Sequence, residues 1–355
     1  AYQGDGHAHD EGRADCSPLG RGEPGSFRKN HRIQVSSLGG VAIFCSFTIA
    51  ILLFATTVNY QKANFLITSC IILFALGLKD DLYGVSPSTK FLLQIVVATI
   101  LVLAGGFRLT SFYGVFLLWE VAPLWGGLFS IGVIIFVNNA FNLIDGVDGL
   151  AGTLGAISTL CFGVFFAIAE TLPYAFIAFA MFGAITGFLV FNYHPAKIFM
   201  GDTGSLIIGL VCVVLAIKFI ELNKVGAKPD PNFYSAPAIA VAVLIIPIFD
   251  SLRIFFIRLL HKKHPFKGDR NHVHHRLQRL GFTTNQIVIS LACVNFLMII
   301  LALMLQGWGN FMLISIIISI CVCLNAIITY RIGKKRDQNY KLSDVIFNDT
   351  FKSAD

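Results

Sequence analysis

The stretch GSLIIGLVCVVLAIKFI, residues 204–220, indicates the fold class of this chain. Lys218 is its single charged residue, and its 17 residues are enough for a helix to cross a hydrocarbon core about 30 Å thick. Since open strands would leave backbone groups unpaired in lipid, and the stretch lacks the alternation of a barrel strand, we expect a helix. Nine similar stretches bring the expected spans to about ten, over residues 40–59, 64–78, 91–106, 125–141, 151–169, 173–191, 236–256, 286–305 and 308–330.

The composition supports an all-α, polytopic membrane protein that has the lipid bilayer as its main solvent. Of the 355 residues, 55% are hydrophobic and only 13% are charged, whereas soluble domains carry about 25% charged residues. The net charge of +7 is spread over several short loops, which favours a membrane-orientation signal and argues against a nucleic-acid partner. Seven of the eight cysteines lie in apolar runs without a C-x-x-C pair, so we expect neither a disulfide framework nor a zinc framework.

The distribution of basic residues predicts the orientation of the spans. If ten spans alternate, 20 of the 27 basic residues share one side with the C-terminal tail, and by the positive-inside rule that side is cytoplasmic. We expect a polar, disordered leader over residues 1–26, a multi-span domain over 27–335 and a cytoplasmic tail over 336–355. Five basic residues fall on the opposite side: Lys62, Arg108, Lys218, Lys224 and Lys228.

A first polar cluster follows the second expected span. Asp80 and Asp81 are adjacent, so on a helix they point about 100° apart and cannot share one metal ion, but they can divide roles between them. Taken alone, the pair is more typical of solvated charge at a helix end. Lys90 follows nine residues later and is either a snorkelling lysine or a clamp for phosphate.

A second cluster is the run NNAFNLIDGVDGLA, residues 138–151. Asn139 and Asn142 have i, i+3 spacing, as do Asp145 and Asp148, which places each pair on one face if the segment is helical. A turn would explain the two Asp-Gly pairs, but not so many oxygen ligands in a row. Hard oxygen donors suit Mg²⁺ or, as an alternative, Mn²⁺.

Two further clusters lie at the same predicted face. In NYHPAKIFMGDTGS, residues 192–205, Asp202 or Thr203 can cap the following helix, and the helix start can also hold the cation of a diphosphate. In GDRNHVHHR, residues 268–276, three histidines within four residues do not match the spacing of structural zinc sites. Contact with anionic lipid is one interpretation, and contact with a substrate phosphate or sugar is the one we favour.

These motifs together resemble the polyprenyl-phosphate N-acetylhexosamine-1-phosphate transferase superfamily, glycosyltransferase family 4. The matching elements are Asp80-Asp81, N-x-x-N-L-I-D-G-x-D-G-L-A at 139–151, I-F-M-G-D-T-G-S at 198–205 and D-R-x-H-x-H-H at 269–275. The last motif is more similar to the branch that acts on UDP-N-acetylglucosamine than to the branch that acts on UDP-N-acetylmuramoyl-pentapeptide. The family commonly has a further N-terminal span where this chain has its polar leader.

The resemblance implies a Mg²⁺-dependent phosphotransferase in the bacterial cytoplasmic membrane, with its active site facing the cytoplasm. Such an enzyme transfers N-acetylhexosamine-1-phosphate, here N-acetylglucosamine-1-phosphate, from a UDP-sugar to undecaprenyl phosphate and releases UMP. The product initiates a cell-envelope polysaccharide such as lipopolysaccharide. A homodimer is compatible with this interpretation.

The resemblance also assigns roles by motif position. Asp80 and Asp81 are expected to be catalytic and near the reacting phosphates, with Asp80 as a base or orienting carboxylate. Asn142 and Asp202 are expected to be metal ligands. Lys90 would hold the diphosphate, Asp148 and Phe199 the uracil, and the histidines the sugar or phosphate. The full expected substrate-binding set is Lys90, Asp145, Asp148, Asn192, Phe199, His272, His274 and His275.

Three other function classes share some of these features. A secondary transporter of an anionic solute would also have about ten spans, but its site would lie near the midplane on broken helices, whereas these clusters lie at one face. A CDP-alcohol phosphotransferase has a D-G-x-x-A-R signature, which the segment 145–152 only partly matches because the arginine is absent. A prenyltransferase needs D-D-x-x-D, and position 84 is glycine.

Overall fold

Helices make up nearly all of the regular structure that the computed structural model describes, in residues 37–54, 63–115, 119–224, 233–260, 271–338 and 340. These residues belong to one unit, Val35–Asp355. No β-strand occurs within the described ranges, where Ser111 and Glu120 meet in an isolated antiparallel bridge. The predicted all-α fold class is therefore confirmed. The leader, residues 1–26, lies outside the described residues.

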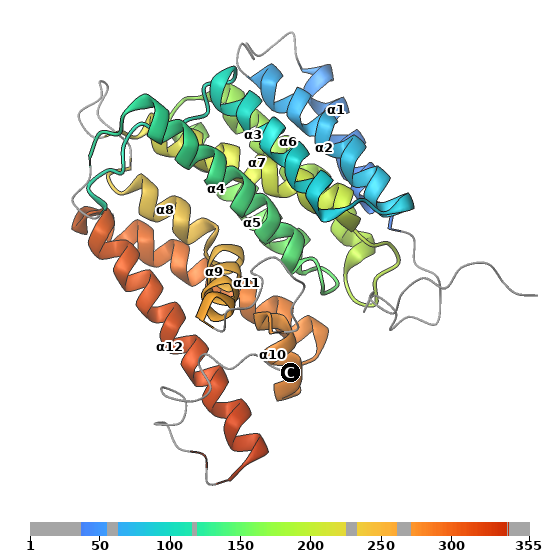
Figure 1. The fold of residues 1–355 in the computed structure, drawn as a ribbon, viewed down its shortest axis with the longest axis vertical. Coiled ribbons are helices and arrows are strands. Elements are labelled where there is room, and N and C mark those ends of the chain that lie inside the picture. Colours follow the sequence, from blue (N-terminus) through green and yellow to red (C-terminus); the bar gives the residue numbers. More distant parts are fainter. Residues whose placement is uncertain are drawn as a thin grey trace, which may run out of the picture. The chain divides into compact units, whose positions relative to one another are not determined.

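Figure 1 shows the helices coloured along the chain. In chain order they are α1 (Gly39–Leu53), α2 (Ala63–Tyr83), α3 (Pro87–Leu103), α4 (Pro123–Ile144), α5 (Leu150–Ile168), α6 (Leu172–Asn192), α7 (Gly201–Leu222), α8 (Ala236–Val243), α9 (Ile245–Leu260), α10 (Val273–Leu280), α11 (Thr284–Met304), the 3₁₀ helix η2 (Gln306–Trp308) and α12 (Asn310–Arg336).

Each expected span overlaps a helix or, for residues 236–256, the bent pair α8 and α9. By length and hydropathy, six helices of the described part can cross a membrane, namely α4, α5, α6, α7, α11 and α12. The bent pair brings this number to seven if it forms one span, while α1 and α3 are apolar but shorter. The chain is a multi-pass membrane protein, and a total of ten spans stays a prediction.

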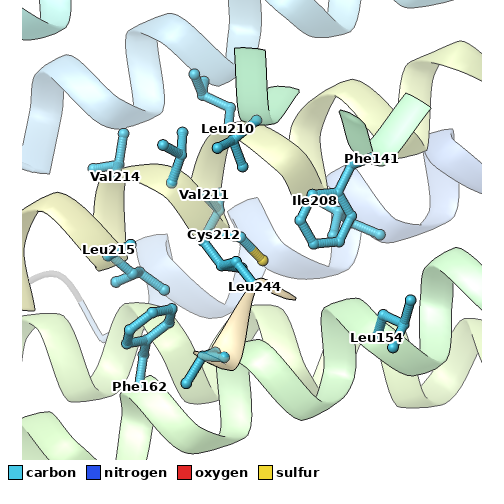
Figure 2. Packing of buried hydrophobic residues seen from close by; sticks show 14 of the residues in the cluster. Phe141, Leu154, Phe162, Ile208, Leu210, Val211, Cys212, Val214, Leu215 and Leu244 are labelled. Atoms are coloured by element: carbon cyan, nitrogen blue, oxygen red, sulfur yellow. The ribbon is translucent and has the colours of Figure 1, made fainter. Parts of the chain in front are cut away.

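The central helix is α7, which packs against α1, α2, α4, α5, α6 and α8 (Figure 1). Almost every residue from Gly201 to Phe219 is buried. Side chains of α4, α5 and the α8–α9 break surround its middle, as Figure 2 shows for Phe141, Phe162 and Leu244. A helix that is apolar on all faces is expected to be buried on all faces, so the stretch that indicates the fold class also forms the centre of the core.

The break between α8 and α9 has a local cause. Pro247 has no N–H to donate to the carbonyl of Val243, four residues earlier, and the two helices meet at 81°. The freed carbonyl instead accepts hydrogen bonds from Asn295 Nδ2 of α11 at 3.2 Å and from Ser158 Oγ of α5 at 3.4 Å. Such side-chain donors are what allows a broken helix to persist inside a membrane protein.

The two ends of α7 define two ends of the bundle. Asp202 lies in its first turn, beside the end of α2, the start of α3 and the end of α4. Glu221 lies in its last turn, beside the loop that follows α3. At a rise of 1.5 Å per residue the two carboxylates are about 28 Å apart along the helix axis. We call these the Asp202 end and the Glu221 end.

Candidate active site

One lysine joins two carboxylates at the Asp202 end. Lys90 Nζ donates to Asp80 Oδ2 at 3.0 Å and also to Asp202 Oδ2. The side chains are 16% exposed for Lys90 and 15% exposed for each aspartate. The ammonium offsets the repulsion between two partly buried carboxylates, and it reaches the surface where an incoming phosphate would need a positive partner.

Asp81 caps α7 from a different helix. Its Oδ1 accepts from the backbone N–H of Asp202 at 2.8 Å, and its Oδ2 accepts from the N–H and the hydroxyl of Thr203 at 3.0 and 2.7 Å. These N–H groups have no partner inside the helix and form its positive pole, so a carboxylate there is stabilising. The start of α7 carries no cap from its own side chains, so the capping role considered for Asp202 or Thr203 falls to Asp81.

Glycines make this approach between helices feasible. Gly201 has a φ of +68°, and a Cβ on it would lie 2.5 Å from Asp81 Oδ2. A Cβ on Gly77 would lie 2.5 Å from the Cα of Thr203. Both positions therefore require glycine, because any side chain would push α2 away from the start of α7 and pull Asp81 off its donors.

Amide side chains attach α4 to its neighbours. Asn142 Nδ2 donates to Asp202 Oδ1 and to Ser205 Oγ, both at 2.9 Å. Asn139 exchanges hydrogen bonds with Gln94 of α3, at 2.8 and 3.2 Å. The segment that carries the two asparagines is helical, which was the condition for their sharing one face. Asn139 bonds to α3, whereas Asn142 bonds to α7.

The turn between α4 and α5 holds the next pair of predicted residues. Because α4 ends at Ile144, Asp145 and Asp148 lie in the turn, and the condition for their sharing one helical face is not met. Asp148 Oδ2 is 2.9 Å from His194 Nδ1 and accepts from the N–H of Ala196 at 3.3 Å. Asp148 thereby links this turn to the segment between α6 and α7.

Asn192 makes a second link between the same segments. It is 4% exposed, its Oδ1 accepts from the N–H of Gly149 at 2.9 Å, and its Nδ2 donates to the carbonyl of Ile198 at 2.8 Å. Phe199 is half-buried next to this segment, and its carbonyl accepts from the N–H of Gly39 at 2.9 Å. Asn192 thus holds two loops together, and its contact with a substrate stays a prediction.

The predicted histidines lie at the start of α10. His272 Nδ1 is 2.8 Å from Asp250 Oδ2 on α9, and the ring of His274 stacks on that of His272 with centroids 5.6 Å apart. His274 is 1% exposed, and its Nε2 would lie 3.1 Å from a Cβ on Gly146, in the α4–α5 turn. Burial, followed by the charge of His275, lowers the pKa of His274 to about 3.

Two of these three histidines are therefore packed inside the protein, and His275 is the more exposed one. This burial ties α10 to the turn that carries Asp145 and Asp148. Asp269 and Arg270, which begin the same motif, lie outside the described residues.

Several residues that position the site were not among the predicted site residues. Gln94 fixes Asn139, and a lone amide in an apolar stretch was a usable signal. Asp250 orients His272, and it also accepts a hydrogen bond at 3.2 Å from Arg253, three residues later on the same helix. Arg276 is buried and donates to side chains of α12, a long-range contact that no local pattern indicates.

The oxygen donors around Asp202 suit a magnesium ion. Mg²⁺ takes one or two protein carboxylates and leaves its other positions to water and substrate phosphates. Asn142 uses its Nδ2 in both of its hydrogen bonds, so its amide oxygen has no hydrogen-bond partner among the described residues. Within that part of the chain no group of three or more His, Cys, Asp or Glu side chains is placed to hold a metal. A cation here would therefore rest on Asp202, Asn142 and its substrate.

Comparisons with known proteins identify the family of this chain. The sequence pattern described as glycosyl transferase family 4 matches residues 63–220, which include Asp80, Lys90, Asn142 and Asp202. A probable undecaprenyl-phosphate N-acetylglucosaminyl 1-phosphate transferase of Bacillus subtilis (strain 168) is 31% identical over 309 residues, which cover 84% of this chain and 82% of the relative. This chain belongs to glycosyl transferase family 4.

Other members of the family are similarly close. The undecaprenyl-phosphate alpha-N-acetylglucosaminyl 1-phosphate transferase of Escherichia coli (strain K12) is 30% identical over 75% of this chain and 72% of its own length. The decaprenyl-phosphate N-acetylglucosaminephosphotransferase of Mycolicibacterium smegmatis is 32% identical over 74% of this chain and 70% of its own length. The resemblance found from the four motifs is confirmed, and the match to the family pattern ends in α7, before the histidines of α10.

Proposed function

We propose that this member of glycosyl transferase family 4 transfers N-acetylglucosamine-1-phosphate from UDP-N-acetylglucosamine to undecaprenyl phosphate. The observation that carries the proposal is the convergence of Asp80, Lys90, Asn142 and Asp202 at one end of a bundle of membrane-length helices. The names of the relatives support transfer of the same sugar phosphate to the same acceptor. The product is the lipid-linked diphosphate sugar that starts a cell-envelope polysaccharide.

The proposed reaction exchanges one phosphate bond for another. An oxygen of the lipid phosphate attacks the phosphorus that carries the sugar. The bond from this phosphorus to the bridging oxygen of the diphosphate breaks, and UMP leaves with that oxygen and the electron pair. The attacking and leaving groups are both anionic, so a preorganised positive charge is the main requirement for such a site.

The residues of the Asp202 end have distinct tasks in this reaction. Lys90 is the positive group that would hold the diphosphate. Asp80 accepts a hydrogen bond from Lys90 and would orient the lipid phosphate or accept its proton. Asp81 holds the backbone that presents Asp202. The acceptor's chain would stay in lipid while its phosphate lies at the bilayer surface, and the location of these groups at the ends of helices supports this arrangement.

Magnesium belongs to the proposal as well. Asp202 and Asn142 would hold the ion, and Asp80 lies on the other side of Lys90. When bound, Mg²⁺ supplies positive charge that offsets the charge developing on the phosphate oxygens.

The proposed location is the bacterial cytoplasmic membrane, with the Asp202 end facing the cytoplasm. The nucleotide sugar is a water-soluble donor, so the site must open to the compartment that supplies it. The excess of basic residues on that side supports the orientation.

The decisive experiment is UMP release by the purified protein with undecaprenyl phosphate, Mg²⁺ and a panel of UDP-N-acetylhexosamines. We expect release with UDP-N-acetylglucosamine, and we expect Asp202→Asn to lower the rate by at least about a hundredfold, as loss of a charged group at a phosphoryl-transfer site does. Glu120→Gln, at an exposed carboxylate 84% accessible at the other end of the bundle, is the matched control and should act like the unchanged protein.

Two outcomes would overturn the proposal. Full activity of Asp202→Asn would remove Asp202 from the site. Binding of the UDP-sugar without UMP release, together with its uptake into vesicles, would instead identify a transporter.

A further inference from the structure

A polar cavity lies at the Glu221 end, remote from the proposed active site. It has a volume of about 380 Å³ and lies between the end of α3, the loop that follows it and the last turns of α7. Val102 and Leu103 form part of its apolar wall, and Arg108, Lys218 and Glu221 contribute charged groups. Lys218 is about 24 Å from Asp202 along the axis of α7, so the cavity takes no part in the reaction at the other end.

The carboxylate in this cavity is satisfied by neutral donors. Glu221 Oε1 accepts from the N–H of Thr110 at 2.8 Å and from the hydroxyl of Tyr113 at 2.7 Å, and its Oε2 accepts from the Thr110 hydroxyl at 2.8 Å. Burial and the nearby Glu221 charge raise the pKa of Tyr113, so its hydroxyl stays protonated and remains a donor. Glu221 therefore anchors the loop after α3 without using a cation of the cavity.

The residues that line the cavity include two basic side chains, Arg108 and Lys218, and one acidic side chain, Glu221. Arg108 is half-buried and makes no hydrogen bond or ion pair with any residue in the described ranges. The ammonium of Lys218 lies 4.9 Å from the ring centroid of Tyr174 on α6. A lysine within an apolar helix is costly, and such residues usually mark a functional or interfacial site.

The composition of the cavity wall indicates its depth in the membrane. Leu103 is 76% exposed at the end of the apolar helix α3, so it faces the lipid chains. Arg108 follows five residues later, after the chain has left the helix. The wall of the cavity thus changes from apolar to basic side chains within a few residues. A membrane changes in the same way at the boundary between acyl chains and headgroups.

The predicted orientation makes this pair of cations unusual. Only five of the 27 basic residues fall on the side of the Glu221 end, and two of these five line the same cavity. Basic residues scattered over short loops would not be expected to meet in this way.

We propose that this cavity binds the phosphodiester headgroup of an anionic membrane phospholipid. Arg108 offers a planar fork of N–H donors to the phosphate oxygens, and Lys218 adds a second positive charge. Val102 and Leu103 would contact the first carbons of the acyl chains. The site is independent of the proposed transferase reaction and can be tested without a substrate.

The test is native mass spectrometry of the purified protein, titrated with phosphatidylglycerol, with phosphatidylcholine and with inorganic phosphate. We expect one tightly held phosphatidylglycerol, and we expect Arg108→Gln and Lys218→Gln each to weaken it about tenfold or more, since a hydrogen bond to a charged group contributes about 1.5–3 kcal/mol. Arg108→Lys should retain part of the affinity. The control Lys224→Gln removes the same charge at the same end, where Lys224 pairs with the exposed Glu120 at 3.4 Å.

The possible results distinguish a specific anionic-lipid site from a site of another kind. Thermal unfolding of each variant checks that the fold is kept, and Arg108→Gln carries the test alone if Lys218→Gln does not fold. Equal affinity for phosphatidylglycerol in Arg108→Gln and Lys224→Gln would overturn the site. Equal retention of phosphatidylcholine, or binding of inorganic phosphate without retention of phosphatidylglycerol, would overturn its assignment to an anionic lipid.

Discussion

Adjacent aspartates at the end of α2 face different partners. Asp80 bonds to Lys90 and to the N–H of Val85, whereas both oxygens of Asp81 bond to the first turn of α7. The angular separation of neighbouring helical residues allows the two aspartates to divide their roles. Asp81 is thus placed to position Asp202, whereas action of Asp80 on a phosphate is part of the proposed function.

A substitution can distinguish these roles. In Asp81→Asn the new NH₂ group would face the N–H of Thr203, so one buried donor loses its acceptor, and we expect a loss of about 1–3 kcal/mol in the free energy of unfolding. Asp202→Asn should lose less, because Asn142 keeps its acceptor and Lys90 keeps Asp80. Unfolding in detergent micelles measures both, and UMP release should be low in both. Equal stability of the two variants would contradict the positioning role of Asp81.

At the scale of elements, α10 is a short helix attached through buried polar residues. Arg276 donates to Asn325 and Thr329 of α12, and His274 packs on the α4–α5 turn. The segment connecting α9 to α10 lies outside the described residues, and within them Asp250 of α9 also accepts from the N–H of Val273 at 2.9 Å. Loss of the attachment would remove the packing of His274 on the turn that carries Asp145 and Asp148.

This attachment predicts sensitivity to acid. The folded protein keeps His274 neutral, with a pKa of about 3, whereas the unfolded chain takes up a proton near pH 6.5. The stabilisation is complete above about pH 6.5 and is lost as the pH falls toward 3, by about 2 kcal/mol between pH 6.5 and 5. Thermal unfolding from pH 8 to 5 should show this slope, and His274→Gln should flatten it. Identical slopes would show that another group controls the acid response.

At the scale of the whole molecule, the sequence predicts elements better than their contacts. Apolar runs in the sequence located each described helix of membrane length. In lipid, every spanning segment must satisfy its own backbone hydrogen bonds, so each segment has a local signal. The bend at Pro247 had a local signal that the continuous apolar run concealed. The bond between Asn142 and Asp202 joins residues 60 positions apart. Their meeting could be expected only through the resemblance to a family, since no spacing rule extends so far.

The orientation of the bundle is a whole-molecule prediction. With the native cysteines replaced, Ser86→Cys at the Asp202 end and Glu120→Cys at the Glu221 end both offer exposed thiols. A membrane-impermeant maleimide should label Glu120→Cys in intact spheroplasts and Ser86→Cys only in inverted vesicles, because the positive-inside rule places the Asp202 end in the cytoplasm. The reverse pattern would refute the orientation and, with it, access of a cytoplasmic donor.

The double attachment of α7 has a consequence for how this chain can vary in length. Asp202 is held at its first turn and Glu221 at its last, each by partners from other helices. One inserted residue between them would turn the far end by about 100° and move it by about 1.5 Å, so both sets of bonds could not be kept. Insertions and deletions should therefore be tolerated in the loops between helices and excluded from the nineteen steps that separate these two carboxylates.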